Sequence, residues 1–218
     1  MKDKRITILS GHYGSGKTNI AVNIALDLKS RHERVAVADI DIVNPYFRTK
    51  DSEELFEREG IRLICSAYAN TNVDIPALPQ EMYAVTDDKS LYAVLDVGGD
   101  ERGALALGRI APAIAKEDDY EMIYVVNFYR PLTQDVESAI EVMREIEYAC
   151  KLKFTSIVNN SNLGAETEAE DVIKSLSKAK ELSEKTGLPL LYTTVKDMTP
   201  ELEGREEKFR PISLQKHM

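Results

Sequence analysis

One short segment constrains the fold of this chain more than any other feature. Residues 11–18 read GHYGSGKT, which matches the pattern GxxxxGKS/T; an apolar run, 6–9, precedes them and a helical pattern follows. A strand, a glycine-rich turn and a helix in this order form a loop whose backbone N–H groups point inward at phosphate oxygens. The dipole of the helix adds to the attraction for an anion. The segment therefore predicts a phosphate-binding loop, hereafter the P-loop.

The side chains of the P-loop predict a nucleotide with its magnesium ion. Lys17 is expected to reach the β- and γ-phosphates, and Thr18 to ligate Mg²⁺. A dinucleotide-binding fingerprint is the weaker interpretation, because it requires Gly or Ala where Asn19 stands. The residues that we expect to bind the nucleotide at this loop are Gly11, His12, Tyr13, Gly14, Ser15, Gly16, Lys17, Thr18 and Asn19.

Apolar runs and helical patterns alternate along the whole chain. The expected strands are residues 6–9, 35–40, 61–65, 92–97, 122–127, 155–158 and 188–193. The expected helices are residues 18–30, 53–59, 104–115, 133–149 and 169–185. Repeated strand–helix–strand units predict a three-layer α/β sandwich, with a mostly parallel sheet of about seven strands and helices on both faces. We expect one nucleotide-binding domain over residues 1–218, with 199–218 as a peripheral tail.

Two acidic segments at strand ends complete the predicted site. Asp39 and Asp41 end the second strand, and Asp96 ends the fourth strand shortly before Gly98 and Gly99. Ligands of open α/β sheets bind beyond the carboxyl ends of the strands. An apolar strand that ends in Asp is typical of the segment that binds Mg²⁺, directly or through water. From the pattern alone, a strand-end Asp can also cap a helix or anchor a loop.

Composition and charge exclude several classes of protein. The chain has 28 Lys and Arg against 37 Asp and Glu, a formal charge of −9. It is therefore expected to be a poor non-specific DNA binder, which would need Lys and Arg to neutralise phosphates, and to be repelled by anionic membranes. No apolar run is long enough for a membrane span, and the charged start shows no secretory signal. Cys65 and Cys150 stand far apart, without a CxxC pair. We therefore expect a cytoplasmic protein that binds neither DNA nor membranes.

Several motifs together resemble one known family. The GSGKT of residues 14–18, the Asn-Ile-Ala of residues 23–25 on the same helix and the Asp-Ile-Asp of residues 39–41 are similar to motifs of the MinD/ParA/CobQ-type P-loop ATPases, which include relatives of the nitrogenase iron protein. The resemblance covers residues 6 to about 194. It implies an ATPase with ATP and Mg²⁺ as cofactors.

The resemblance implies roles for individual residues of the hydrolysis site. Lys17 and Asp41 would be catalytic, with Asp41 positioning the attacking water. Thr18, Asp39 and Asp96 would hold the magnesium ion or its water shell.

The resemblance also predicts which residue binds the adenine of the nucleotide. Asn159 falls where the family has an Asn that pairs with adenine, and the GTPase pattern NKxD does not follow it, which favours ATP over GTP. From the residues alone, Asn159 can also be a turn residue at a strand end.

The chain departs from the family at one P-loop position. Many members carry a Lys near the start of the loop that reaches the nucleotide of a second subunit, and here His12 stands in its place. An ATP-dependent homodimer would need His12 itself, Arg48 or Arg102 to supply that charge. The C-terminal membrane helix of MinD-type proteins and the cysteine pairs of iron–sulfur carriers are not found in the sequence.

Three functions remain as hypotheses. The first is a switch ATPase, in which ATP orders residues 41–48 and 96–102 and an unknown partner protein senses the difference. The second is an ATP-dependent kinase or ligase of the dethiobiotin synthetase or CobQ type, with an acceptor pocket built from residues 66–80 and 128–130. The third is a regulator that binds ATP without hydrolysing it.

Overall fold

A computed structural model describes residues 3–40, 50–65, 80–99 and 101–212 of the chain. The predictions for Asp41, for Arg48 and for the irregular segment 66–78 fall outside these residues. The described strands form one eight-stranded sheet in the order β3-β2-β4-β1-β5-β6-β7-β8, and all neighbouring strands are parallel. The strands are β1 (Ile6–Ser10), β2 (Val35–Asp39), β3 (Arg62–Cys65), β4 (Tyr92–Asp96), β5 (Tyr120–Val126), β6 (Ser156–Asn159), β7 (Leu190–Val195) and β8 (Phe209–Pro211).

Helices connect the successive strands from β1 to β7, as is usual for parallel pairing, whereas residues 196–208 link β7 to β8 without a helix. The α-helices are α1 (Lys17–Lys29), α2 (Lys50–Glu59), α3 (Ala84–Asp87), α4 (Glu101–Gly108), α5 (Ala111–Glu117), α6 (Val136–Cys150) and α7 (Ala169–Thr186). Short 3₁₀ turns are η2 (Gln80–Tyr83), η3 (Pro131–Thr133) and η4 (Gly164–Glu166).

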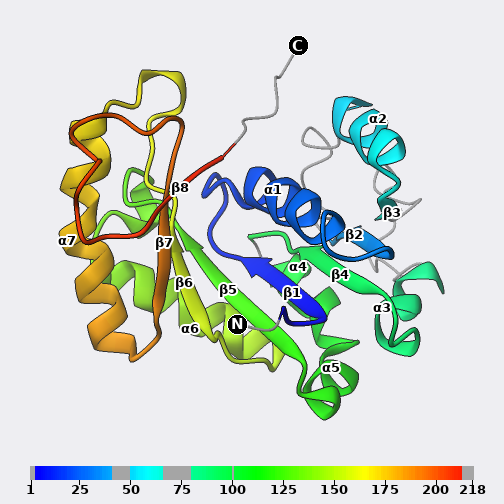
Figure 1. The fold of residues 1–218 in the computed structure, drawn as a ribbon. Helices are drawn as coiled ribbons and strands as arrows, with labels where there is room; N and C mark the ends of the chain where they lie inside the picture. The colour runs from blue at the N-terminus through cyan, green and yellow to red at the C-terminus, as the bar shows by residue number, and fades with distance from the viewer. Residues whose placement is uncertain (1–2, 41–49, 66–79, 100, 213–218) are drawn as a thin grey trace.

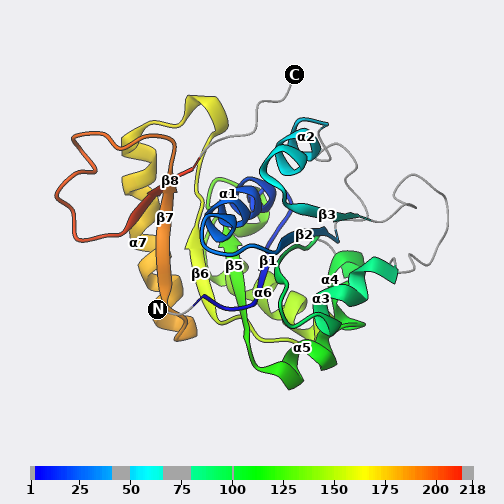
Figure 2. The same cartoon turned by 45° about the vertical axis from the view of Figure 1, so that its right-hand side comes forward.

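Alternate residues of each central strand serve two separate cores. In β1, Ile6 and Ile8 join the core under α4 to α7, whereas Leu9 joins the core under α1 and α2. This period of two is what a sheet covered on both faces demands. Figures 1 and 2 show α1 over the middle of the sheet and α7 beside β6 and β7. The predicted three-layer α/β fold with helices on both faces is confirmed.

Some predicted boundaries are wrong for local reasons. The helix expected over residues 104–115 is two helices, α4 and α5, because Pro112 stands in the first turn of α5, where its missing N–H costs nothing. Helix α6 begins after Asp135, whose side chain caps Ser138 N at 2.8 Å, and not at Thr133. The region expected to be a peripheral tail contributes strand β8, which pairs with β7 and extends the sheet to eight strands.

The register of the sheet brings the strand ends of the predicted site together. Asp39 of β2 is the registered partner of Asp96 of β4, and Asp96 in turn pairs with Leu9 of β1. The P-loop follows β1 directly. Parallel strands all end at the same edge, so both carboxylates and the P-loop lie at the carboxyl edge of the sheet.

A buried ion pair holds the opposite edge of the sheet. Arg5, 4% exposed, forms a bidentate pair with Glu117 and donates to the carbonyls of Val85 at 2.8 Å and Leu91 at 2.9 Å. Its guanidinium therefore connects β1 with α3, β4 and α5. The hydrogen bond from Arg5 is the main cause that lowers the pKa of Glu117.

We predict that Arg5→Met lowers the free energy of unfolding by about 3 kcal/mol, because the part-buried carboxylate of Glu117 loses its bidentate partner and two carbonyls lose a donor. Urea unfolding at pH 7 measures this change. Lys89→Met is the matched control, since Lys89 contacts the same Glu117 from a 60% exposed position and should cost less than about 1 kcal/mol.

The difference between wild type and Arg5→Met should also depend on pH. A carboxyl with a lowered pKa stabilises the folded state above its ordinary value of 4.5, and this contribution disappears as pH falls through the lowered pKa. The two proteins should therefore approach one another in stability below pH 4.5. A constant difference down to low pH would contradict this account of the pair.

Candidate functional site

The P-loop adopts a backbone that only glycine allows at three positions. Gly11, Gly14 and Gly16 have φ of 152°, 75° and 85°. A Cβ on Gly11 would lie 2.2 Å from Val125 O, and a Cβ on Gly16 would lie 2.2 Å from Asn160 Nδ2. The loop is therefore pressed against the ends of β5 and β6, with no room for side chains at these points.

Polar groups inside the loop face one another. Lys17 is 7% exposed, and its Nζ donates to His12 O at 3.3 Å, while Ser15 N donates to the same carbonyl at 3.1 Å. The hydroxyls of Ser10 and Ser15 are buried and have no hydrogen-bond partner among the described residues. Buried unpartnered hydroxyls beside a buried ammonium fit a polar, anionic ligand.

A second contact joins α1 to β4 at the mouth of the loop. Thr18 Oγ1 donates to Asp96 Oδ2 at 2.6 Å, and Asp96 is 6% exposed. Asp39 stands next to Asp96 in the sheet register and is half-buried. Hydroxyl and carboxylate oxygens are the donors that Mg²⁺ prefers in proteins. The structure thus brings together the three described residues that were predicted to hold the metal.

The segment after Asp96 lies directly on the P-loop. A Cβ on Gly99 would lie 2.5 Å from Gly11 O and 2.5 Å from Tyr13 N. A Cβ on Gly103, in the first turn of α4, would likewise lie 2.8 Å from Gly98 N. Close backbone contact therefore runs from the P-loop through residues 98–99 to α4.

Asn159, predicted to read the base, is fully buried at the end of β6. Its Nδ2 donates to Ser175 Oγ at 2.8 Å and to Thr193 Oγ1 at 3.3 Å, and its Oδ1 accepts from Ser161 N and Oγ. These bonds connect β6 with α7 and β7. The role of Asn159 in binding the adenine base remains a prediction. For that role, its side-chain amide would have to exchange these hydrogen bonds for bonds to the base.

The next residue, Asn160, faces the P-loop. Its Nδ2 donates to Ser15 O at 2.6 Å, its Oδ1 accepts from Thr194 Oγ1, and its carbonyl accepts from Asn162 Nδ2 at 2.7 Å. Asn160 therefore connects the P-loop to the ends of β6 and β7. The sequence analysis missed this residue, and only the conformation of the strand end decides which of two consecutive Asn residues faces the loop.

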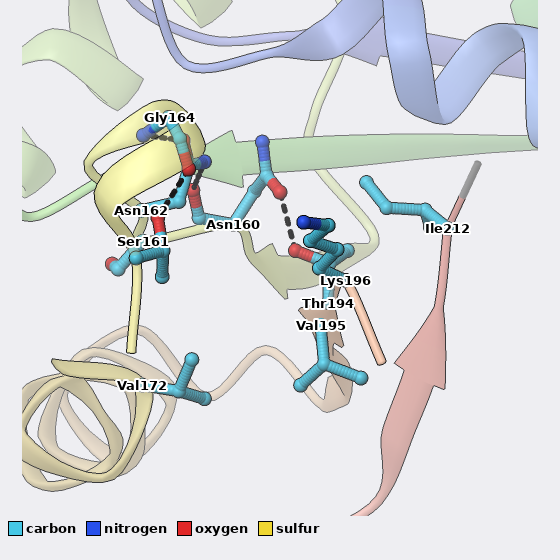
Figure 3. A pocket seen from close by; sticks show the side chains of 10 residues that line it. Asn160, Ser161, Asn162, Gly164, Val172, Thr194, Val195, Lys196 and Ile212 are labelled. Carbon is cyan, nitrogen blue, oxygen red and sulfur yellow. Dashed lines mark hydrogen bonds between the residues drawn. The ribbon is translucent and has the colours of Figure 1, made fainter. Parts of the chain in front are cut away.

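A small cavity of about 40 Å³ opens beside Asn160 (Figure 3). Its walls come from the segment that follows β6, from the end of β7, from α7 and from Ile212. A volume of this size holds a few water molecules, so a planar ring could lie only across its mouth. Its lining includes Asn160, Asn162, Thr194, Val195 and Ile212.

The remaining predicted residues lie around the loop. Tyr13, in the P-loop, is 60% exposed. Asn19 is half-buried in α1, and its backbone carbonyl accepts a hydrogen bond from Asn23 Nδ2 at 2.7 Å. Arg102 is exposed at the start of α4. A cation that the sequence analysis did not assign to the loop is Arg130, whose Nε donates to Gly14 O at 3.0 Å.

The residues present fit a nucleoside triphosphate with Mg²⁺. The loop offers backbone N–H groups and a buried ammonium for phosphates, and the oxygens of Thr18 and Asp96 stand beside it for a cation. These contacts define the class of P-loop nucleotide-binding domains.

The comparison with protein families agrees and is more specific. Residues 6–191 match the family described as the CobQ/CobB/MinD/ParA nucleotide binding domain. This match covers most of the chain, so the chain belongs to that family. The resemblance seen in its motifs is confirmed.

Individual relatives are distant. The chain is 32% identical over 96 residues to the cytosolic Fe-S cluster assembly factor cfd1 of Emericella nidulans, a match that covers 44% of this chain and 27% of that protein. The chain thus spans about a quarter of the length of this curated relative.

Within the described residues, no helix combines the length and the apolar character that a membrane span needs.

Two solved structures share the fold. The signal recognition particle receptor FtsY of Elizabethkingia anophelis in complex with GDP has a TM-score of 0.56 and 18% identity, and covers 89% of this chain and 58% of that chain. FtsY of Thermotoga maritima has a TM-score of 0.58 and 15% identity, with 87% and 61% covered. At this identity the likeness concerns the fold alone.

We predict that Gly99→Ala weakens nucleotide binding at least about tenfold, because its Cβ must displace the backbone of the P-loop. Titration with a fluorescent ATP analogue measures the effect. Gly187→Ala is the control, since its added Cβ meets nothing within 4 Å and its φ of 70° costs only about 1 kcal/mol of stability. Unchanged affinity of Gly99→Ala would show that the contact does not constrain the loop.

Proposed function

We propose that this protein is a Mg-ATP-dependent switch ATPase that signals its nucleotide state to a partner protein. The observation that carries the proposal is the contact of Gly99 with the P-loop backbone at Gly11 and Tyr13. A segment packed on the loop that binds phosphates must respond to what the loop holds. Ordering of such a segment by the γ-phosphate, and its release after hydrolysis, is a known way to convert nucleotide state into shape.

The proposed roles follow the geometry of the loop. Lys17 would hold the β- and γ-phosphates, which requires it to leave the carbonyl of His12. Thr18 would ligate Mg²⁺, and Asp96 and Asp39 would hold the ion's water molecules. Asp41 would position the attacking water, as the family resemblance implies. The bound Mg²⁺ would neutralise charge that develops on the phosphates.

A groove beside the loop offers a surface where a partner could sense the switch. It has a volume of about 510 Å³ and lies between the P-loop, α4 and α6. Leu132 and Tyr148, 59% and 78% exposed, border it, which is typical of surfaces that bind other proteins. His12 of the P-loop and Gly99, which packs on the loop, both line it. The lining residues that matter here are His12, Gly99, Ala104, Leu132, Glu145 and Tyr148.

The fungal relative is named as a factor in cytosolic Fe-S cluster assembly. A cytosolic location would fit this protein as well. Of its two cysteines, Cys65 is exposed and Cys150 is buried, and burial raises the pKa of the Cys150 thiol, which disfavours metal binding there. Within the described residues, no group of three His, Cys, Asp or Glu side chains could hold a metal ion.

A second candidate function is an ATP-dependent enzyme of the dethiobiotin synthetase or CobQ type. The same groove favours it, because a cavity of about 510 Å³ that reaches the P-loop could hold a small acceptor molecule. ATP turnover that appears only when a metabolite is added would support this alternative. Turnover that responds to a protein and to no metabolite would oppose it.

We predict that Mg-ATP converts the protein into a homodimer and so raises its solution mass, whereas Mg-ADP does not. The reason is that a γ-phosphate orders the surface around residues 96–99, on which the second copy would bind. Light scattering on the Asp41→Ala variant, which should bind ATP without hydrolysing it, measures the mass. Lys17→Ala in the same background is the control and should stay at the nucleotide-free mass. Identical masses in all states would exclude an ATP-dependent homodimer. The remaining hypotheses would then be a monomeric switch ATPase and the ATP-dependent enzyme.

We also predict that ATP competes for the site at least about tenfold better than GTP, because no NKxD pattern follows β6. Competition against a fluorescent ATP analogue measures the ratio. Asn162→Ala, at the rim of the small cavity, should reduce this preference, whereas Asn159→Ala should mainly lower stability. If Asn159→Ala removes the preference and leaves stability intact, Asn159 reads adenine after its amide exchanges partners. A GTP preference in wild type would refute the assignment of ATP.

A further inference from the structure

Arg130 is held against the P-loop from a distant part of the chain. Its Nε donates to Gly14 O at 3.0 Å, across 116 positions of sequence. Gly14 has a φ of 75°, and a Cβ there would lie 3.1 Å from Arg130 Nε. The glycine thus provides both the conformation of the loop and the space in which the arginine lies along it.

The backbone that carries Arg130 is fixed by a network of hydrogen bonds. Arg130 N donates to Asn127 O at 3.1 Å, and Thr133 N donates to Arg130 O at 3.0 Å. Thr133 Oγ1 donates to the same Asn127 carbonyl at 2.7 Å, and both side chains are buried. Tyr129 OH donates to Asp171 O at 2.9 Å and anchors the segment on α7. The network presents Arg130 from a rigid support.

The charge of Arg130 is not neutralised by its described neighbours. Arg5, Arg31 and Arg34 form ion pairs with carboxylates, whereas no ion pair joins Arg130 to any carboxylate that the structure describes. The side chain is exposed. With Nε bound to a carbonyl, the two terminal nitrogens of the planar fork remain for an anion. A fixed, exposed guanidinium on a phosphate-binding loop selects a phosphate group as its partner.

We propose that Arg130 contacts the terminal phosphate of Mg-ATP. This inference rests on the proposed nucleotide-binding function. The phosphate belongs either to the nucleotide on the same P-loop or to that on a second copy of the chain. The chemistry is the same in both cases. The guanidinium would bind the terminal phosphate with two N–H groups, so it would strengthen binding of the triphosphate more than that of the diphosphate, which lacks this phosphate.

The test compares Arg130→Ala and Arg130→Lys with wild type, all in the Asp41→Ala background. Calorimetry should show that Arg130→Ala weakens Mg-ATP about tenfold or more and Mg-ADP less than twofold, with partial recovery in Arg130→Lys. Arg109→Ala is the matched control, because Arg109 is exposed and follows the C-terminal end of α4, whereas the N-terminal end of α4 is the one near the loop. It should bind both nucleotides like wild type.

Two outcomes overturn the inference. Unchanged affinities in Arg130→Ala exclude any contact with phosphate, and equal weakening of ATP and ADP means that Arg130 only supports the loop. If wild type itself binds neither nucleotide, the proposed function fails first, and independently of Arg130.

Mixing two variants then identifies whose phosphate is bound. If Arg130 serves a second copy, Asp41→Ala mixed with Arg130→Ala restores ATP hydrolysis, since the Asp41→Ala copy binds ATP and supplies Arg130 to the nucleotide of the copy that keeps Asp41. If Arg130 serves its own nucleotide, the mixture stays as inactive as its components.

Discussion

The contact between the end of β4 and the P-loop is the constraint on which the site depends. Val97 N donates to Leu9 O at 3.0 Å, so the pairing of β4 with β1 continues to the point where the loop begins. One residue earlier, Asp96 meets Thr18 at 2.6 Å, and two residues later Gly99 touches the loop backbone. Because the pairing is parallel, both segments leave the sheet at the same edge and have to pack on one another.

This arrangement extends the influence of the loop beyond the loop itself. Gly103 packs on Gly98, so α4 lies at close backbone distance from residues 98–99. Helix α4 packs against α6, and the groove between them includes His12 of the loop. A displacement of a few tenths of an ångström at Gly99 cannot easily be absorbed by flexible side chains, because the three atoms nearest to its Cβ position all belong to the backbone. Closely packed interfaces of this kind tend to shift as units.

Much of the fold follows from patterns that are local in sequence. The P-loop, the strand that ends at Asp96 and the alternation of strands and helices depend on residues within a few positions of each other, and the structure bears out the fold that they predict. Strand β8 was missed because its three residues form a strand only by pairing with β7. The break before α5 was missed because Pro112 was taken as a tolerated interruption of one helix, whereas it occupies the first turn of another.

The parts of the site that sequence reasoning missed are those that cross long distances in the chain. Asn160 reaches Ser15 across 145 positions, and Arg130 reaches Gly14 across 116. Both bind carbonyls of the loop, whose N–H groups would face the phosphates. Asn160 uses its side chain for bonds within the protein, whereas Arg130 binds Gly14 O through Nε and keeps its two terminal nitrogens for a phosphate. A motif that specifies only the loop contains no information about such partners. Their separate supports, β6 for one and the buried Asn127 network for the other, make the loop a preorganised site that does not have to be ordered by its ligand.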